Sequence, residues 1–208
     1  MSFDFKQFLE LEHNKNKKVQ KLPERKLTEV EHTLLIDSRH RNRTVYSNSN
    51  SFIVKFDSGN ESNPTIYHKY KNISKIFLTH AVLPKRIVTF PYLILDIPEI
   101  QSINIAGTND LLNRCFAILI PEHHHNDGDF VNCNIQYIDD HKHIYKPPIA
   151  SLPQTFSISI YEPSGSLANL GTDNTASNPP KETVQAFFIF KVYCQEESFE
   201  KINSYMVN

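Results

Sequence analysis

The residues with the clearest metal-binding chemistry are histidines in the second half of the chain. His123, His124 and His125 are consecutive, and His141 and His143 follow downstream. Imidazole is a good ligand for zinc and similar ions. Successive residues of an extended chain point in alternate directions, so His123 and His125 could share one ion, with His141 and His143 approaching across a hairpin. The pattern nevertheless favours a solvated hairpin loop over a metal site, and no cofactor is predicted.

A second polar cluster follows the short apolar run at 33–36. Asp37 is followed by Arg39, Arg41 and Arg43 within a loop rich in Ser and Asn. Guanidinium groups bind carboxylates through parallel hydrogen bonds, and an Asp at the end of a strand can also cap the turn that follows. The pattern predicts a structural corner in which Arg39, next to the strand, stabilises the fold. Arg43, farther along the loop, is expected to contact a neighbouring subunit instead.

Other catalytic patterns are weak in this sequence. Cys115, Cys133 and Cys194 are far apart and odd in number, which predicts buried, inert thiols in a reducing compartment. The chain contains neither a nucleophile elbow nor a Gly-rich phosphate loop. Its net charge is −1, and no aromatic platform flanks the arginines. We therefore predict that the protein is not an enzyme and makes no direct contact with nucleic acid.

Alternating apolar residues predict β-strands along most of the chain, at 33–36, 51–56, 72–82, 92–97, 116–120, 131–137, 156–161 and 186–194. The alternation places Phe52, Val54 and Phe56 on one face, and likewise Phe156, Ile158 and Ile160. Three further predictions concern particular segments. Ile76, Leu78 and Val82 share one face of their strand, 186–194 is central and covered on both faces, and 163–180 is a long exposed loop. Such a series fits an all-β fold, a two-sheet sandwich of single jelly-roll type.

The ends of the chain have a different composition from this β-rich part. Residues 1–30 are predicted to be an N-terminal arm with an aromatic tip (Phe3, Phe5 and Phe8), a lysine-rich stretch and a break at Pro23. The jelly-roll domain is expected at 31–196, and a C-terminal tail at 197–208. No stretch is apolar enough to span a membrane, and acidic residues interrupt any signal sequence. A soluble intracellular product is expected.

Several short motifs occur in an unusual order between residues 34 and 120. They are Ile36-Asp37-Ser38-Arg39 with Arg41-Asn42, then Lys71-Asn72-Ile73, Ala81-Val82-Leu83-Pro84-Lys85 and Pro91-Tyr92-Leu93-Ile94-Leu95. This order resembles the minor capsid or penton-type structural proteins of nucleocytoplasmic large DNA viruses, the giant and algal viruses. His40 departs from the pattern, which has an acidic residue after the arginine. The resemblance implies a single jelly roll built into an icosahedral shell.

A shell component of this kind works through protein–protein contacts. The expected partners are other capsid proteins, including the major capsid protein, and further copies of the chain, in a virion assembled after synthesis in the host cytoplasm. We expect the contacts to involve the arm and the corner, at Phe3, Phe5, Phe8, Arg39, Arg41 and Arg43. Two alternatives stay open: a carbohydrate-binding β-sandwich at a virion surface, stacking sugars on Tyr137, Tyr145 and Tyr161, and a metal-dependent cupin-like enzyme that uses the histidines.

Overall fold

The structure of the chain is a computed structural model that describes residues 27–56, 65–100, 107–122, 129–135, 143–173 and 179–197. The chain divides into two compact units. One comprises Glu29–Glu196, and the other comprises Met1–Thr28 together with Glu197–Asn208. Of the second unit, the structure describes only Leu27, Thr28 and Glu197, which are terminal residues of strands.

The described residues are mostly β-strands, which confirms the predicted all-β class. The strands are β1 (Leu27–Asp37), β2 (Ser51–Phe56), β3 (Thr65–Ile66), β4 (Lys71–Pro84), β5 (Leu93–Asp96), β6 (Ala117–Pro121), β7 (Phe130–Ile135), β8 (His143–Ser151), β9 (Thr155–Tyr161) and β10 (Phe187–Glu197). One short helix, α2 (Asp110–Arg114), and four 3-10 turns accompany them: η1 (Ser38–His40), η2 (Lys85–Ile87), η3 (Pro98–Ile100) and η4 (Glu182–Val184). Three of these elements, β3, β8 and α2, were not predicted from the sequence.

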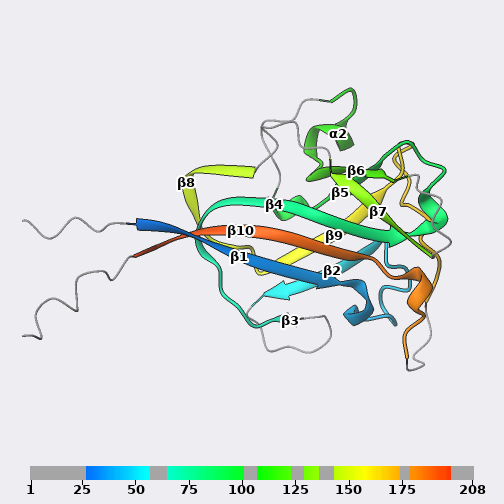
Figure 1. The fold of residues 1–208 in the computed structure, drawn as a ribbon, viewed down its shortest axis with the longest axis horizontal. Coiled ribbons are helices and arrows are strands. Elements are labelled where there is room, and N and C mark those ends of the chain that lie inside the picture. Colours follow the sequence, from blue (N-terminus) through cyan, green and yellow to red (C-terminus); the bar gives the residue numbers. More distant parts are fainter. Residues whose placement is uncertain are drawn as a thin grey trace, which may run out of the picture. The chain divides into compact units, whose positions relative to one another are not determined.

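The strands form one curled sheet in the order β1-β10-β4-β7-β6-β5-β9-β2-β3. The long strand β4 pairs with β10 along one edge, whereas β8 and β7 share its other edge, β8 near its start and β7 near its end. Figure 1 shows β1, β10 and β4 running side by side. β10 with β4, β2 with β9, β4 with β7 and with β8, β5 with β6 and with β9, and β6 with β7 all pair antiparallel, whereas β2 and β3 are parallel. Strands from both halves of this order contribute to a single core, in which the Phe116 and Phe190 rings lie 5.7 Å apart.

Burial in the core follows the predicted two-residue period in β2 and β9. Phe52, Val54 and Phe56 are buried, as are Phe156, Ile158 and Ile160, so both predicted faces are confirmed. The prediction that 186–194 is covered on both faces is wrong. β10 is central, between β1 and β4, but buried and half-buried residues alternate along it, so only one of its faces is sealed.

A β-bulge in β4 overturns the predicted faces of that strand. Ile76 and Leu78 are buried as expected, but the core-facing residues beyond them are Ala81 and Leu83 rather than Val82. The pairing with β10 slips between Ile189–His80 and Phe190–Leu78, which leaves Thr79 as an extra residue. Because side chains alternate with period two, one inserted residue exchanges the two faces for the rest of the strand.

The predicted exposed loop at 163–180 is also wrong in part. Its first turn is exposed around Gly165, but Ala168, Leu170 and Asp173 are buried. Gly171 lies between them with a φ of +93°, and a Cβ at this position would approach Cγ1 of Val184 to 2.7 Å. The segment is therefore held tightly against η4, and only glycine fits at its closest approach.

Two adjacent phenylalanines on β10 allow a test of whether only one face of this strand is buried. Phe188 is fully buried and Phe187 is half-buried on the opposite face. We expect Phe188→Ala to lower the free energy of unfolding by about 3–5 kcal/mol through cavity formation. Phe187→Ala should cost about 1 kcal/mol, as is typical of partly exposed positions. Urea melts of the two variants measure the difference, and equal large losses would mean that β10 is covered on both faces after all.

Candidate functional site

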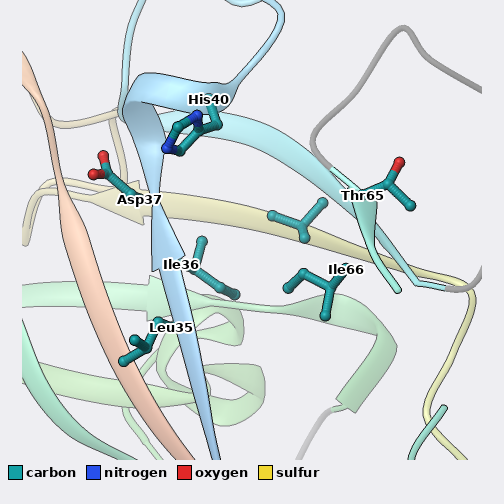
Figure 2. A pocket seen from close by; sticks show the side chains of 7 residues that line it. Leu35, Ile36, Asp37, His40, Thr65 and Ile66 are labelled. Carbon is teal, nitrogen blue, oxygen red and sulfur yellow. The ribbon is translucent and has the colours of Figure 1, made fainter. Parts of the chain in front are cut away.

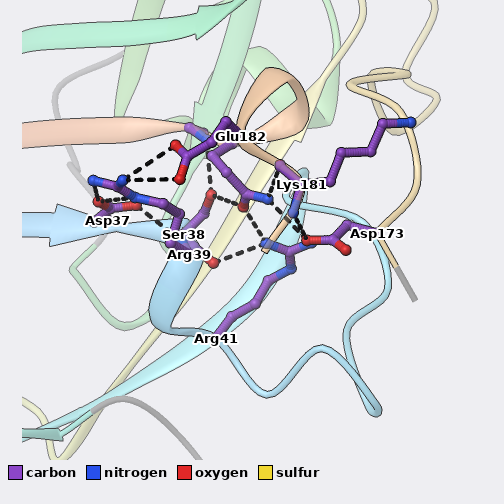
Figure 3. A network of polar contacts seen from close by, with 9 residues as sticks. Asp37, Ser38, Arg39, Arg41, Asp173, Lys181 and Glu182 are labelled. Carbon is purple, nitrogen blue, oxygen red and sulfur yellow. Dashed lines mark hydrogen bonds and ion pairs between the residues drawn. The ribbon is translucent and has the colours of Figure 1, made fainter. Parts of the chain in front are cut away.

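The predicted corner lies where the end of β1 meets Asp173 and residues 181–186, and we call this polar group the corner network (Figure 3). Asp37 ends β1 and caps η1, because its Oδ1 accepts a hydrogen bond of 2.9 Å from the backbone N–H of Arg39. Its Oδ2 accepts from the Arg39 guanidinium at 2.7 Å. The prediction that Asp37 both caps the turn and pairs with a guanidinium is confirmed.

The centre of the corner network is Arg41, whose surface is only 3% exposed. Its guanidinium donates to the backbone carbonyls of Ser38 (2.8 Å), Tyr46 (2.8 Å) and Ser47 (3.1 Å), and to the side-chain carbonyl of Gln185. Burial lowers the pKa of Arg41, and the negative charge of Asp173 opposes that shift. An arginine has so high an ordinary pKa that the group stays charged. The cation thus holds the loop after η1 through backbone acceptors.

Three further buried residues join the two chain segments around Arg41. The Ser38 hydroxyl donates to Gln185 Oε1 at 3.0 Å and accepts from the N–H of Ala186 at 2.7 Å. Gln185 Nε2 donates to Asp173 Oδ2 at 3.0 Å, and the N–H of Asp173 donates to the carbonyl of Ser47 at 2.8 Å. Ser38, Asp173 and Gln185 were not predicted as members of this site, since nothing in their local sequence signals a partner more than a hundred residues away.

The other two arginines have roles opposite to those predicted. The Arg39 side chain is 44% exposed, and beyond Asp37 it pairs with the exposed Glu182 at 3.2 Å. The Arg43 side chain is only 14% exposed, and its Nη1 lies 3.5 Å from the buried carboxylate of Asp173. The prediction that Arg39 is the structural residue and Arg43 is free for a neighbour is therefore wrong. Arg41 has the main structural role.

The corner network has little capacity for an external anion. A hollow of about 500 Å³ is lined by Arg39, Arg41 and Arg43 together with Glu182. These three guanidinium groups are matched by three carboxylates, those of Asp37, Asp173 and Glu182. The donors of Arg41 are directed at protein carbonyls. Such an arrangement stabilises the chain at this corner rather than presenting net positive charge to a phosphate.

Only one of the four candidate metal ligands lies within the described residues. His143, on β8, is 4% exposed, stacks on the Phe116 ring with centroids 4.1 Å apart, and makes a 2.9 Å hydrogen bond through Nε2 to the Phe116 carbonyl. His123, His125 and His141 lie outside the described residues, as do Phe3, Phe5 and Phe8 of the arm. Among the residues that the structure describes, no group of three or more His, Cys, Asp or Glu side chains could hold a metal ion.

The three thiols are free and buried, as predicted. Burial raises the pKa of Cys115 to about 11 and that of Cys133 to about 12, so neither forms an appreciable thiolate near neutral pH. Tyr145, one of the three tyrosines expected to stack sugars, packs partly against the core, and burial of its hydroxyl raises its pKa to about 12. Tyr161 is half-buried at the end of β9, and Tyr137 lies outside the described residues.

A buried carboxylate at the end of β5 was not predicted. Asp96 is 1% exposed, and its Oδ1 has no hydrogen-bond partner among the described residues. Its Oδ2 lies 3.7 Å from Nε of Arg114, whose side chain is 50% exposed. Burial raises the pKa of Asp96, Arg114 opposes the shift, and Glu99 adds to it. The ionised form is therefore disfavoured in the folded protein.

No protein-family model matches this chain, and a search of curated proteins finds no significant similarity to it. Among the described residues, no helix combines the length and apolar character that crossing a membrane requires.

The corner network makes a direct prediction about its two contrasting arginines. Arg41→Lys should lower the free energy of unfolding by about 3 kcal/mol, because an ammonium group cannot reach the buried carbonyls that the planar guanidinium serves. Arg39→Lys should cost about 1 kcal/mol or less, since its pairs are exposed. Denaturant melts of the two single variants measure this order. The reverse order would restore the role that the sequence predicted for Arg39.

The buried carboxylate makes a prediction about pH. Because the folded-state pKa of Asp96 is raised, its contribution to stability is fully present below the unfolded-state pKa and is lost as pH rises through the folded-state value. Asp96→Asn removes this loss and should stabilise the protein by about 1 kcal/mol at neutral pH, with no gain at acid pH where Asp96 is protonated. Urea melts at both pH values measure the effect. Destabilisation at neutral pH would mean that attraction to Arg114 outweighs burial.

Proposed function

We propose that this protein is a structural component of an icosahedral virus capsid, a minor capsid or penton-type protein that acts through protein–protein contacts. The proposal includes a jelly-roll arrangement of the sheet and a place in the virion after synthesis in the host cytoplasm. Its partners would be the major capsid protein, other capsid proteins and further copies of the chain. The sequence resemblance over residues 34–120 motivates the proposal, and the strand order supports the architecture that this resemblance implies.

Eight of the strands fall into two runs of four neighbours, β1-β10-β4-β7 and β6-β5-β9-β2. In each run, strands from the first half of the chain (β1 to β5) alternate with strands from the second half (β6 to β10). A jelly roll has this interleaving, because two Greek keys wrap the first and second halves of the chain around one another. The two remaining strands, β3 and β8, lie beside these runs as additions. The order therefore supports a jelly roll as the architecture.

Exposed apolar side chains on one face of the sheet support a role in making contacts. Phe130 is 41% exposed, and Val82 and Phe187 are paired on the neighbouring strands β4 and β10. A shallow hollow of about 360 Å³ is lined by these three residues and Ala186, together with the polar residues Asp37, Arg39, Glu182 and Gln185. Leu35, on β1, is 57% exposed. Grouped apolar side chains on a surface are typical of a protein–protein interface.

Jelly rolls also serve as lectins and cupins, so the fold alone does not select the function. Electron cryo-microscopy of purified virions of the source virus tests the proposal directly. We expect density for one jelly roll per copy, fitted by the Glu29–Glu196 unit, in contact with the major capsid protein. Absence of the protein from purified particles would contradict it. Glycan binding by the purified protein would then favour the carbohydrate-binding alternative, and stoichiometric bound metal the cupin-like one.

The arm can be tested separately from the domain. Deleting residues 1–22 should leave the melting temperature nearly unchanged, because these residues precede the compact unit Glu29–Glu196 and are expected to form a separate arm. The same deletion should reduce incorporation into particles, since the aromatic tip is expected to make assembly contacts. Thermal melts and quantitative blotting of purified particles measure the two effects. A large loss of thermal stability would place the arm in the core of the domain instead.

A further inference from the structure

An apolar groove lies between β1 and the β2–β3 pair, and we call it the edge groove (Figure 2). It encloses about 390 Å³, and its rim also includes the polar residues Asp37, His40 and Thr65. Ile36 of β1 and Ile66 of β3 point toward one another across it, and Val54 of β2 also lines it. Ile36 and Val54 are almost fully buried, so they form the floor, whereas Ile66 is half-buried. The edge groove therefore combines an apolar base with walls that a ligand can reach.

The two walls of the edge groove are the two ends of the sheet. β1 is the first strand in the pairing order and β3 is the last. β1 is 11 residues long and pairs with β10 along one edge, and within the described part of the chain no strand pairs with its other edge. An open strand edge presents N–H and C=O groups that can bind an extended segment as an added strand. The edge groove is thus suited to an extended peptide with alternating apolar side chains.

The N-terminal segment of this protein has that pattern. Phe3, Phe5, Leu9 and Leu11 alternate with charged residues, Asp4, Lys6, Glu10 and Glu12. A two-residue period places the four apolar side chains on one side of an extended chain. We propose that the edge groove binds residues 3–11 of a second copy of this protein, added along the open edge of β1 with aromatic side chains over the apolar floor. The inference deepens the proposed shell function and rests on it.

A second copy is a better source of the segment than the same chain. To fill its own groove, the arm would have to reverse before β1, but residues 17–26, which directly precede β1, contain none of the Gly, Asn or Asp residues that tight hairpin turns favour. Pro23 also favours an extended conformation for the residue before it. The roughly 20 residues between Phe5 and Leu27 could span up to about 70 Å when extended. That length is sufficient to reach an adjacent subunit.

Disulfide trapping with two differently tagged full-length chains tests the contact. One chain carries Phe5→Cys and the other Thr65→Cys, at the rim of the edge groove. The native cysteines are buried, and a wild-type mixture measures their background. Ile144→Cys is the matched control, since Ile144 is 47% exposed on β8, which β4 and β10 separate from β1. We expect a mixed-tag dimer with Thr65→Cys and only background with Ile144→Cys.

Two results would overturn the inference. Background-level trapping at Thr65 would exclude the edge groove as the site of the arm. A chain that carries both Phe5→Cys and Thr65→Cys and forms only an internal disulfide, without mixed dimers, would show that the arm fills its own groove. Because trapping uses purified protein, it is independent of particle imaging. Absence from virions would refute the shell function alone, whereas failed trapping of a protein found in virions would refute the groove alone.

Sedimentation of the full chain gives a second, non-covalent measurement. Ile66→Glu places a charge on the groove wall and should weaken self-association about tenfold. Tyr67→Glu changes the next residue, which is 80% exposed, and should leave self-association unchanged. Equal melting temperatures would show that both variants are folded. Should Ile66→Glu fail to fold, Thr65→Arg at the rim replaces it, and unchanged association in the folded variant would contradict the inference.

Discussion

Arg41 brings a positive charge into a part of the fold where almost none of its surface meets water, and the chain around it is arranged to supply its acceptors. Three of those acceptors are backbone carbonyls, from Ser38, Tyr46 and Ser47. A buried guanidinium is tolerated only when its donors are satisfied and a negative charge lies near. Gln185 and Asp173 meet these two needs from a distant segment. The path of the loop after β1 and the position of η4 therefore depend on one side chain.

The described strands follow one another in the sheet from β1 at one end to β3 at the other. Such an open sheet has two edge strands, whereas a closed barrel has none. β1 carries Glu29 and Glu31 on its exposed side, where they pair with Lys75 and Lys191. These lysines belong to β4 and β10, on the paired side of β1, so the ion pairs connect β1 to its neighbours in the sheet. They lie toward the start of β1, whereas the edge groove lies near its end.

The sequence predicts the strands well where one simple period governs burial. β2 and β9 alternate without interruption, and their buried faces were predicted residue by residue. Prediction failed where a second segment sets the geometry. Thr79 is an extra residue only in relation to the register of β10. The position of Asp173 depends on its contacts with Gln185 and Arg43. The arginines were misassigned for a local reason: a 3-10 turn aligns residues three apart, so Arg41 shares the inner side with Ser38 although Arg39 is nearer the strand.

The corner network and the edge groove share a wall, and this links stability to the proposed contact. Asp37 and His40 line the edge groove, while Arg39 and Arg41, in and just after the same 3-10 turn, attach that turn to η4 and Gln185. An added strand gains most when its template is already rigid, because less conformational entropy is lost on binding. The buried hydrogen bonds of Arg41 fix η1, and η1 directly follows the residues of β1 that form the floor. A charge buried on one side of the turn thereby preorganises a binding edge on the other.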